Sequence, residues 1–128
     1  MLRTGLIVAA IAASTLGGCG SKSAAEVSKK DMVAVRESHA AARVGEPKQK
    51  VLDSFKSGNK VKLGASELGG ATIEEWKVEA FHDEKNRRDL FVTFLYFRND
   101  KFVDSSDTRI DFRNNAAILE RWAGAAKP

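Results

Sequence analysis

The sequence predicts an α+β domain in which two N-terminal helices pack on a three-stranded antiparallel meander, with a short C-terminal helix after it. Apolar residues recur at helical spacing before residue 58, and beyond residue 71 they alternate with polar residues or form β-branched and aromatic runs. Removal of a leader of 18 residues is expected to reduce the 128 residues to 110, which is enough for one domain with a single core.

The leader has the pattern of a bacterial lipoprotein signal peptide, residues 1–18. Its uncharged run Gly5–Thr15 is too short to cross a bilayer core, which requires roughly 20 residues as a helix. The next four residues resemble a lipobox, which is an aliphatic residue and two small residues before a cysteine. We therefore expect lipidation of Cys19 by palmitate-type acyl chains, after signal-peptidase recognition at Leu16, Gly17 and Gly18. The alternatives are a signal peptide without lipidation and a short transmembrane anchor.

Cys19 is the only cysteine, so its lipidation leaves no thiol for catalysis, for a metal ion or for a disulfide. Gly20 and Ser21 include no aspartate of the kind that retains lipoproteins in the inner membrane. This favours the outer membrane of a two-membrane bacterium, with the domain facing the periplasm. We assign residues 19–27 to the lipidated cysteine and a flexible tether, and residues 28–128 to a single domain. The net charge of +4, without a dense basic and aromatic pattern, argues against a nucleic-acid partner.

Two helices are predicted in the first half of the mature chain. Ser28, followed three residues later by an acidic residue, resembles a capping box and predicts a helix over Lys29–Ala42. A second helix follows Gly45 and has Pro47 in its first turn. Gly58 is expected at its C-terminal end. Its apolar stripe consists of Val51, Leu52 and Phe55.

Three strands are predicted in the second half. Thr72–Ala80 alternates apolar and charged residues, as expected of a half-buried strand. Residues 82–89 (HDEKNRRD) are expected to form a charged loop. Leu90–Phe97 is β-branched and aromatic on both faces, which is typical of a central strand. After a turn, a third strand is expected to begin at Phe102 and to continue past a bulge to Phe112.

A last helix is expected to be capped by Asn114 or Asn115 and to end near Gly124. Its apolar residues are Ile118, Leu119 and Trp122.

The central strand carries apolar side chains on both faces. One set can cover the two N-terminal helices, and the other needs cover from the last helix or from a partner protein. The candidate partner surface is Phe91, Leu95, Phe97 and Trp122, and the alternative is an internally covered core.

Five short motifs carry a resemblance to a known family. They are Arg43-Val44-Gly45-Glu46-Pro47, Val51-Leu52, Glu75-Trp76-Lys77-Val78, Leu95-Tyr96-Phe97 and Asn99-Asp100-Lys101-Phe102-Val103. On a lipoprotein they resemble the SmpA/OmlA (BamE-like) family of small outer-membrane lipoproteins and, more broadly, the β-lactamase-inhibitor-like α-α-β-β-β domain. The resemblance implies a non-enzymatic adaptor or accessory subunit in outer-membrane assembly or maintenance, with an envelope protein as its partner.

No residue pattern predicts catalysis, a metal site or a cofactor. His39 and His82 are the only histidines, and no group of histidines and carboxylates has metal-ligand spacing. Glu74 and Glu75 are neighbours in a predicted strand, so their side chains are expected on opposite faces rather than as an acid–base pair. A nucleophile at Ser105 is disfavoured because no histidine lies near it in the sequence.

Lys48, Lys50 and Lys56 form a candidate contact with anionic lipid, worth ~1 kcal/mol per basic residue near such a surface. The alternative is a solvated helix face. For the whole protein the adaptor function is favoured. The alternative is a ligand-binding or enzyme-inhibitory periplasmic lipoprotein that uses the charged loop of residues 82–89, and a hydrolase is least favoured because histidines are so few.

Overall fold

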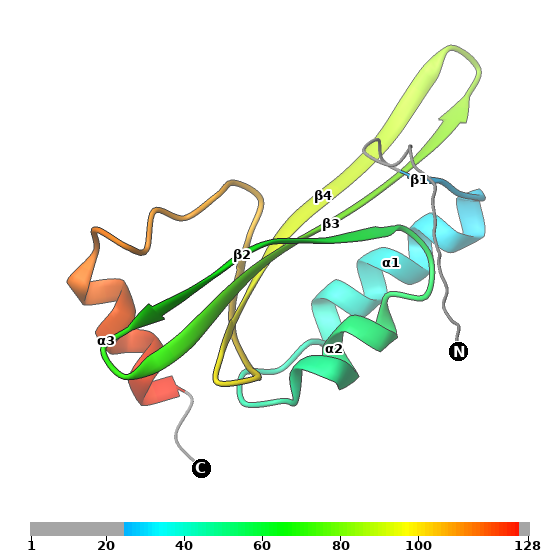
Figure 1. The fold of residues 1–128 in the computed structure, drawn as a ribbon. Helices are drawn as coiled ribbons and strands as arrows, with labels where there is room; N and C mark the ends of the chain where they lie inside the picture. Colours follow the sequence, from blue (N-terminus) through cyan, green and yellow to red (C-terminus); the bar gives the residue numbers. More distant parts are fainter. Residues whose placement is uncertain (1–24, 126–128) are drawn as a thin grey trace, which may run out of the picture.

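The computed structural model describes residues 25–125, and the order of elements is clear in Figure 1. The predicted signal peptide, with Leu16, Gly17 and Gly18, and the predicted lipidation site Cys19 lie outside the described residues. The elements are β1 (Ala25–Glu26), α1 (Lys29–Ala41), α2 (Lys48–Ser54), β2 (Asn59–Leu68), β3 (Ala71–Glu84), β4 (Arg87–Arg98), β5 (Lys101–Ser106) and α3 (Ala116–Ala125).

Four strands, β2 to β5, form an antiparallel meander, and β1 adds a short parallel segment beside β3. The predicted three-stranded meander is therefore wrong. The missed strand is β2, which contains Gly64 and two lysines and alternates too weakly to be recognised. It forms because it pairs along β3, from Asn59 opposite Glu79 to Leu68 opposite Ala71.

Each of the three hairpins closes with a two-residue turn in which both residues have positive φ. The turns are Gly69-Gly70, Lys85-Asn86 and Asn99-Asp100. This geometry matches type I′ turns, whose twist suits antiparallel strands. The predicted charged loop of residues 82–89 is consequently almost all strand, with only Lys85 and Asn86 outside β3 and β4.

The predicted helices are present with changed ends. Ser28 accepts a hydrogen bond from the backbone N–H of Asp31 at 3.0 Å, as the capping box predicted, and α1 ends one residue early. The second helix stops at Ser54, well before Gly58. Asn115 caps α3 by accepting from the N–H of Ile118 at 3.1 Å.

Two predicted boundaries also change. The third strand does not continue to Phe112, because the chain leaves the sheet after Ser106 and Phe112 packs against α3 instead. At the N-terminal side, Ala25 and Glu26 pair with Ala80 and Phe81 of β3, so the end of the predicted tether belongs to the sheet.

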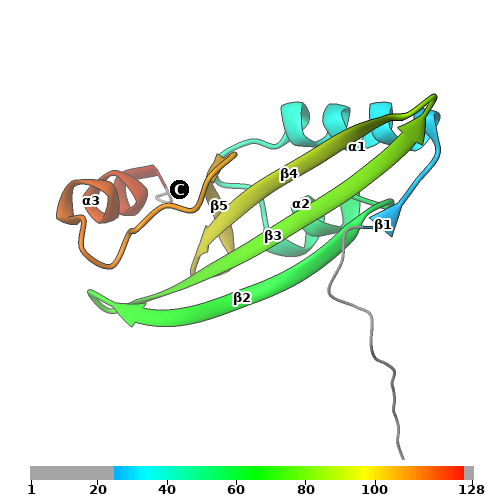
Figure 2. The ribbon, with the colours of Figure 1, turned by 90° about the horizontal axis from the view of Figure 1, so that it is seen from above.

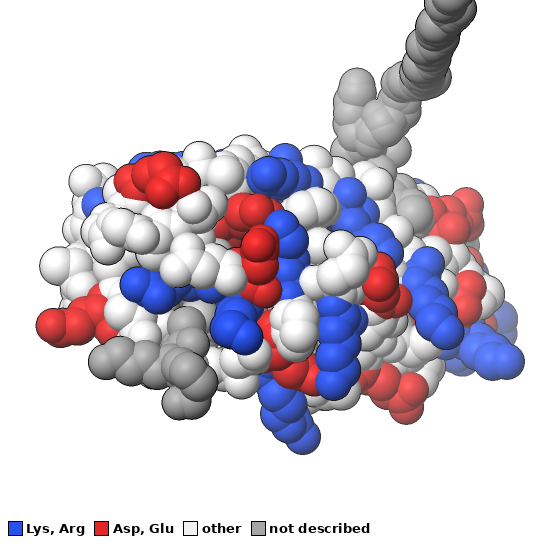
Figure 3. All heavy atoms as spheres, turned by 60° about the horizontal axis from the view of Figure 1, so that its bottom comes forward, with Lys and Arg blue, Asp and Glu red and all other residues white. Residues whose placement is uncertain are grey.

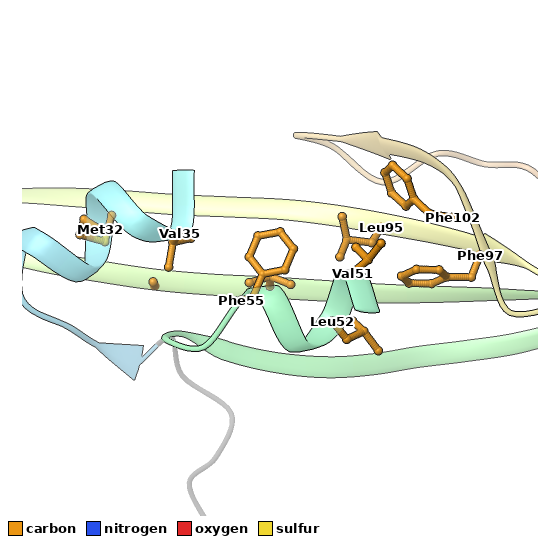
Figure 4. Close-up of a cluster of buried hydrophobic side chains, with 10 residues drawn as sticks. Met32, Val35, Val51, Leu52, Phe55, Leu95, Phe97 and Phe102 are labelled. Carbon is orange, nitrogen blue, oxygen red and sulfur yellow. The ribbon is translucent and has the colours of Figure 1, made fainter. Parts of the chain in front are cut away.

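The core consists of two clusters on opposite faces of the sheet. Figure 2 shows that α3, which covers one cluster, lies apart from α1 and α2, which cover the other. The first lies between the sheet and helices α1 and α2 and is shown in Figure 4. Its buried residues are Met32, Val35, Val51, Leu52, Phe55, Val78, Ala80, Leu95, Phe97 and Phe102. The second lies under α3 and consists of Ile73, Tyr96, Val103, Phe112 and Trp122.

Candidate functional site

The predicted partner surface of Phe91, Leu95, Phe97 and Trp122 is not a surface. Leu95, Phe97 and Trp122 are fully buried, and Phe91 is half-buried against the first cluster. The reason is that α1 and α2 cover the odd-numbered face of β4, whereas Trp122 stacks on Tyr96 on the other face, with 5.1 Å between ring centroids. The prediction is corrected in favour of its alternative, an internally covered core.

Glu74 anchors α2 on one face of the sheet. Its carboxylate accepts hydrogen bonds from Lys48 Nζ at 3.0 and 3.1 Å and from Trp76 Nε1 at 2.8 Å. Lys48 also pairs with Asp100 at 2.9 Å, in the β4–β5 turn. Burial alone would raise the pKa of Glu74, but the bonds from Trp76 and Lys48 outweigh it and hold that pKa below its usual value.

Glu75 anchors the segment between β5 and α3 on the opposite face. Glu75 is only 2% exposed, and its carboxylate accepts from Tyr96 Oη at 2.7 Å and from Nη2 and Nε of Arg109 at 2.6 and 3.2 Å. Tyr96 Oη in turn accepts from the backbone N–H of Ile110 at 2.8 Å. Burial alone would raise the pKa of Glu75, but the bonds from Arg109 and Tyr96 outweigh it and lower that pKa. The pKa of Tyr96 is raised by burial and by the neighbouring charge of Glu75.

These carboxylates are therefore structural. Each makes several hydrogen bonds, and the two lie on opposite faces, as the strand geometry predicted. Within residues 25–125 no group of three or more His, Cys, Asp or Glu residues could hold a metal ion.

The structure does bring one unpredicted pair together. His39 Nε2 lies 3.2 Å from Ser105 Oγ, although the two are 66 residues apart in the sequence. The His39 ring packs edge-on against Phe91, and burial lowers the pKa of His39. Among the described residues no hydrogen bond joins His39 to a carboxylate, so the pair is not part of a Ser–His–acid triad. His82 lies elsewhere, with its Nδ1 3.0 Å from the carbonyl of Val27.

Two of the three predicted lipid-contact lysines are engaged in ion pairs within the domain. Lys48 is held between Glu74 and Asp100, and Lys50 pairs with Glu46 at 2.7 Å. Lys56 is exposed. On the face shown in Figure 3, basic and acidic side chains are interspersed.

The β3–β4 hairpin retains apolar surface on the side away from α1 and α2. We call this surface the outer face, and it consists of Phe81, Leu90, Val92 and Phe94. Leu90 is 52% exposed, and the other three are half-buried. Arg88 lies over the Phe81 ring at 4.1 Å and pairs with Asp83 at the hairpin end. An apolar centre with paired charges at its margin is typical of a surface that contacts another protein.

The hollow beside the hairpin end is lined only by charged residues and a histidine: Lys29, His82, Glu84, Arg87, Arg88 and Asp89. It has no hydrophobic wall of the kind that small-ligand sites use. None of the helices within residues 25–125 is long and apolar enough to cross a membrane. No family model, curated protein or solved structure matches this chain.

Proposed function

We propose that the mature protein is a lipid-anchored, non-enzymatic lipoprotein of the bacterial outer membrane. It faces the periplasm and acts as an adaptor in outer-membrane assembly or maintenance. The observation that carries the proposal is the sequence Leu16-Gly17-Gly18-Cys19 after an uncharged run, because an aliphatic and two small residues before the first mature cysteine suit lipidation. The motifs that resemble SmpA/OmlA (BamE-like) lipoproteins support the adaptor role.

The distance between anchor and domain fits this function. Six Cα spacings separate Cys19 from Ala25, and an extended chain of that length spans at most about 22 Å. Ala25 pairs with Ala80 of β3, near the end of the β3–β4 hairpin. Lipidation at Cys19 would therefore hold the hairpin close to the bilayer surface, where it can meet membrane-embedded or peripheral partners.

The arrangement of polar groups supports binding rather than chemistry. Glu74 and Glu75 are engaged in hydrogen bonds that join the layers of the fold, and the outer face offers apolar area for another protein. This favours an adaptor over the ligand-binding alternative, for which the charged hollow at the hairpin end provides no apolar wall.

The anchor is tested by mass spectrometry of the native protein purified from membranes. We expect an N-terminus at Cys19 that carries acyl chains, and resistance to extraction with carbonate. Cys19→Ser is the matched control, because it keeps the leader and the domain but removes the acceptor sulfur. A native protein that retains residues 1–18, or that carries a free thiol and washes off membranes, would overturn the proposal.

The adaptor role is tested separately by deleting the gene and measuring permeability of the outer membrane to large antibiotics. We expect increased permeability, restored by the wild-type protein and poorly restored by Cys19→Ser. An unchanged barrier, together with the absence of any specific protein crosslinked to the anchored form in intact cells, would contradict an envelope adaptor.

A further inference from the structure

Half of β4 has a strand on only one side. β3 pairs with β4 along its whole length, but β5 pairs only with Phe94 to Arg98. Along residues 87–92, no strand of the described chain lies on the other side. β5 therefore occupies only part of the position beside β4. We call the unoccupied part, which lies beside residues 87–92 and in line with β5, the lane.

The register shows which backbone groups point into this lane. In a two-residue hairpin the residues that flank the turn, Glu84 and Arg87, form a hydrogen-bonded pair, and bonded and non-bonded pairs then alternate. Arg88, Leu90 and Val92 are thus in non-bonded pairs, and their N–H and C=O groups point away from β3. An independent contact agrees, because the carbonyl of Phe81, opposite Leu90, accepts from Val27 N–H at 2.8 Å on the far side of β3.

The open stretch of β4 and the outer strand β2 differ in where their charges and bulges lie. β2 carries Lys60 and Lys62 and a bulge after Lys62, which are devices that discourage strand addition. In β4 the charges lie at the hairpin end, and Leu90 and Val92 continue without a bulge. An edge with apolar side chains and unpaired backbone groups is a template for another strand.

Helix α1 runs along the same stretch of β4 (Figures 1 and 2), so the lane is bordered by β4 and by α1. Arg36 holds Asp89 through two hydrogen bonds of 2.8 and 3.0 Å. Val33, one helical turn before Arg36, is 54% exposed. Val33 and Leu90 are two of the three large hydrophobic residues that are exposed within residues 25–125, and both belong to elements that border this lane.

We propose that this lane binds an extended segment of a partner protein, which adds to β4 in line with β5. The segment is about five residues long, forms backbone hydrogen bonds with Arg88, Leu90 and Val92, and has apolar side chains at alternate positions. The described N-terminal side of the chain is held at the opposite edge of the sheet by β1. The proposed strand therefore belongs to another molecule. This inference rests on the proposed adaptor function and names how the partner is held.

The test uses the mature chain from residue 19, made without lipid as the Cys19→Ser form, so its result is independent of the anchor experiments. A phage-displayed library of random heptapeptides is selected on this protein, and the enriched peptide is synthesised as the probe. Backbone hydrogen exchange is then measured by NMR. Without peptide we expect fast exchange at Arg88, Leu90 and Val92 and protection at Asp89 and Phe91. With peptide we expect at least tenfold slower exchange at the first three.

Leu90→Pro is the decisive variant, because it removes an N–H that points into the lane and leaves the bonds to β3 intact. We expect at least a tenfold loss of peptide affinity, whereas Leu90→Val, which keeps the N–H, should retain binding within about threefold. The far-UV circular dichroism of both variants checks the fold, and the wild-type exchange pattern stands even if Leu90→Pro unfolds. Unchanged exchange at these amides, selection of peptides that bind elsewhere, or protection that arises from self-association without peptide would overturn the proposal.

Discussion

The carboxylates of Glu74 and Glu75 are neighbours in β3 and bind opposite layers of the fold. Glu74 accepts from Lys48 and so ties α2 to one face of the sheet. Glu75 accepts from Tyr96 and Arg109 and ties the chain leading to α3 to the other face. Two consecutive positions in β3 thus tie both helical layers to the sheet, because successive side chains of a strand point to opposite faces.

Replacing Tyr96 with Phe tests the contribution of the Glu75 network. The hydroxyl joins Glu75 to the N–H of Ile110, so its loss removes one hydrogen bond from the buried carboxylate and takes the acceptor from the Ile110 N–H. We expect the free energy of unfolding to fall by ~1–2 kcal/mol, measured by urea denaturation. Glu120→Gln, at an exposed position of α3, is the control and should leave stability unchanged. A Tyr96→Phe protein as stable as the wild type would show that this network contributes little.

Acid stability should depend on the same glutamates. The pKa values of Glu74 and Glu75 are lower in the folded protein than the ordinary 4.5, because bonds from Trp76, Lys48, Arg109 and Tyr96 favour the charged forms over the effect of burial. Their stabilisation is complete above pH 4.5 and is lost as the pH falls through the lowered folded values. Glu75→Gln should flatten the fall of unfolding free energy below pH 4.5 relative to wild type. Identical slopes for the two proteins would contradict the assignment.

Lys48, at the start of α2, and Lys56, just after this helix, should differ in their effect on stability. Lys48 has a side chain only 22% exposed and bridges Glu74 and Asp100, so Lys48→Ala leaves the buried Glu74 carboxylate with the longer 3.9 Å contact to Lys62 as its remaining ion pair. We expect a loss of ~1–3 kcal/mol in the free energy of unfolding. Lys56→Ala, at an exposed position, should change it by less than ~0.5 kcal/mol. Equal losses in the two variants would show that the Lys48 bridge is not stabilising.

His39 should add a second pH dependence near neutrality. Burial lowers the pKa of His39 below 6.5, so the folded protein binds fewer protons than the unfolded chain between the two values. Above pH 6.5 His39 is neutral in both states, and its burial does not reduce the free energy of unfolding. This free energy falls as the pH drops from 6.5 toward the lowered pKa of the folded protein. NMR titration of the His39 ring should give a midpoint below 6.5, and His39→Gln should remove this part of the slope. A midpoint at or above 6.5 would contradict burial as the controlling effect.

The differences between expectation and structure have specific causes. The α1 cap at Ser28 and the Asn115 cap of α3 were predictable, because a cap depends on residues three positions apart. The fourth strand was missed because β2 is stabilised by its pairing with β3 more than by its own composition. Arg109 could not be recognised as the partner of Glu75, since the two are 34 residues apart and meet only after the chain leaves β5.

The sequence by itself determined the lipobox-like segment, the order of two helices before a meander, and a central strand that is apolar on both faces. These features depend on local composition and spacing, which a strand or helix expresses without knowledge of its neighbours. Only the tertiary structure decided that α1 and α2 cover the face with Leu95 and Phe97, that α3 covers Tyr96, and that β5 stops short of Leu90. The choice of face and the length of each pairing depend on contacts between distant segments, and the open edge of β4 is a consequence of those contacts.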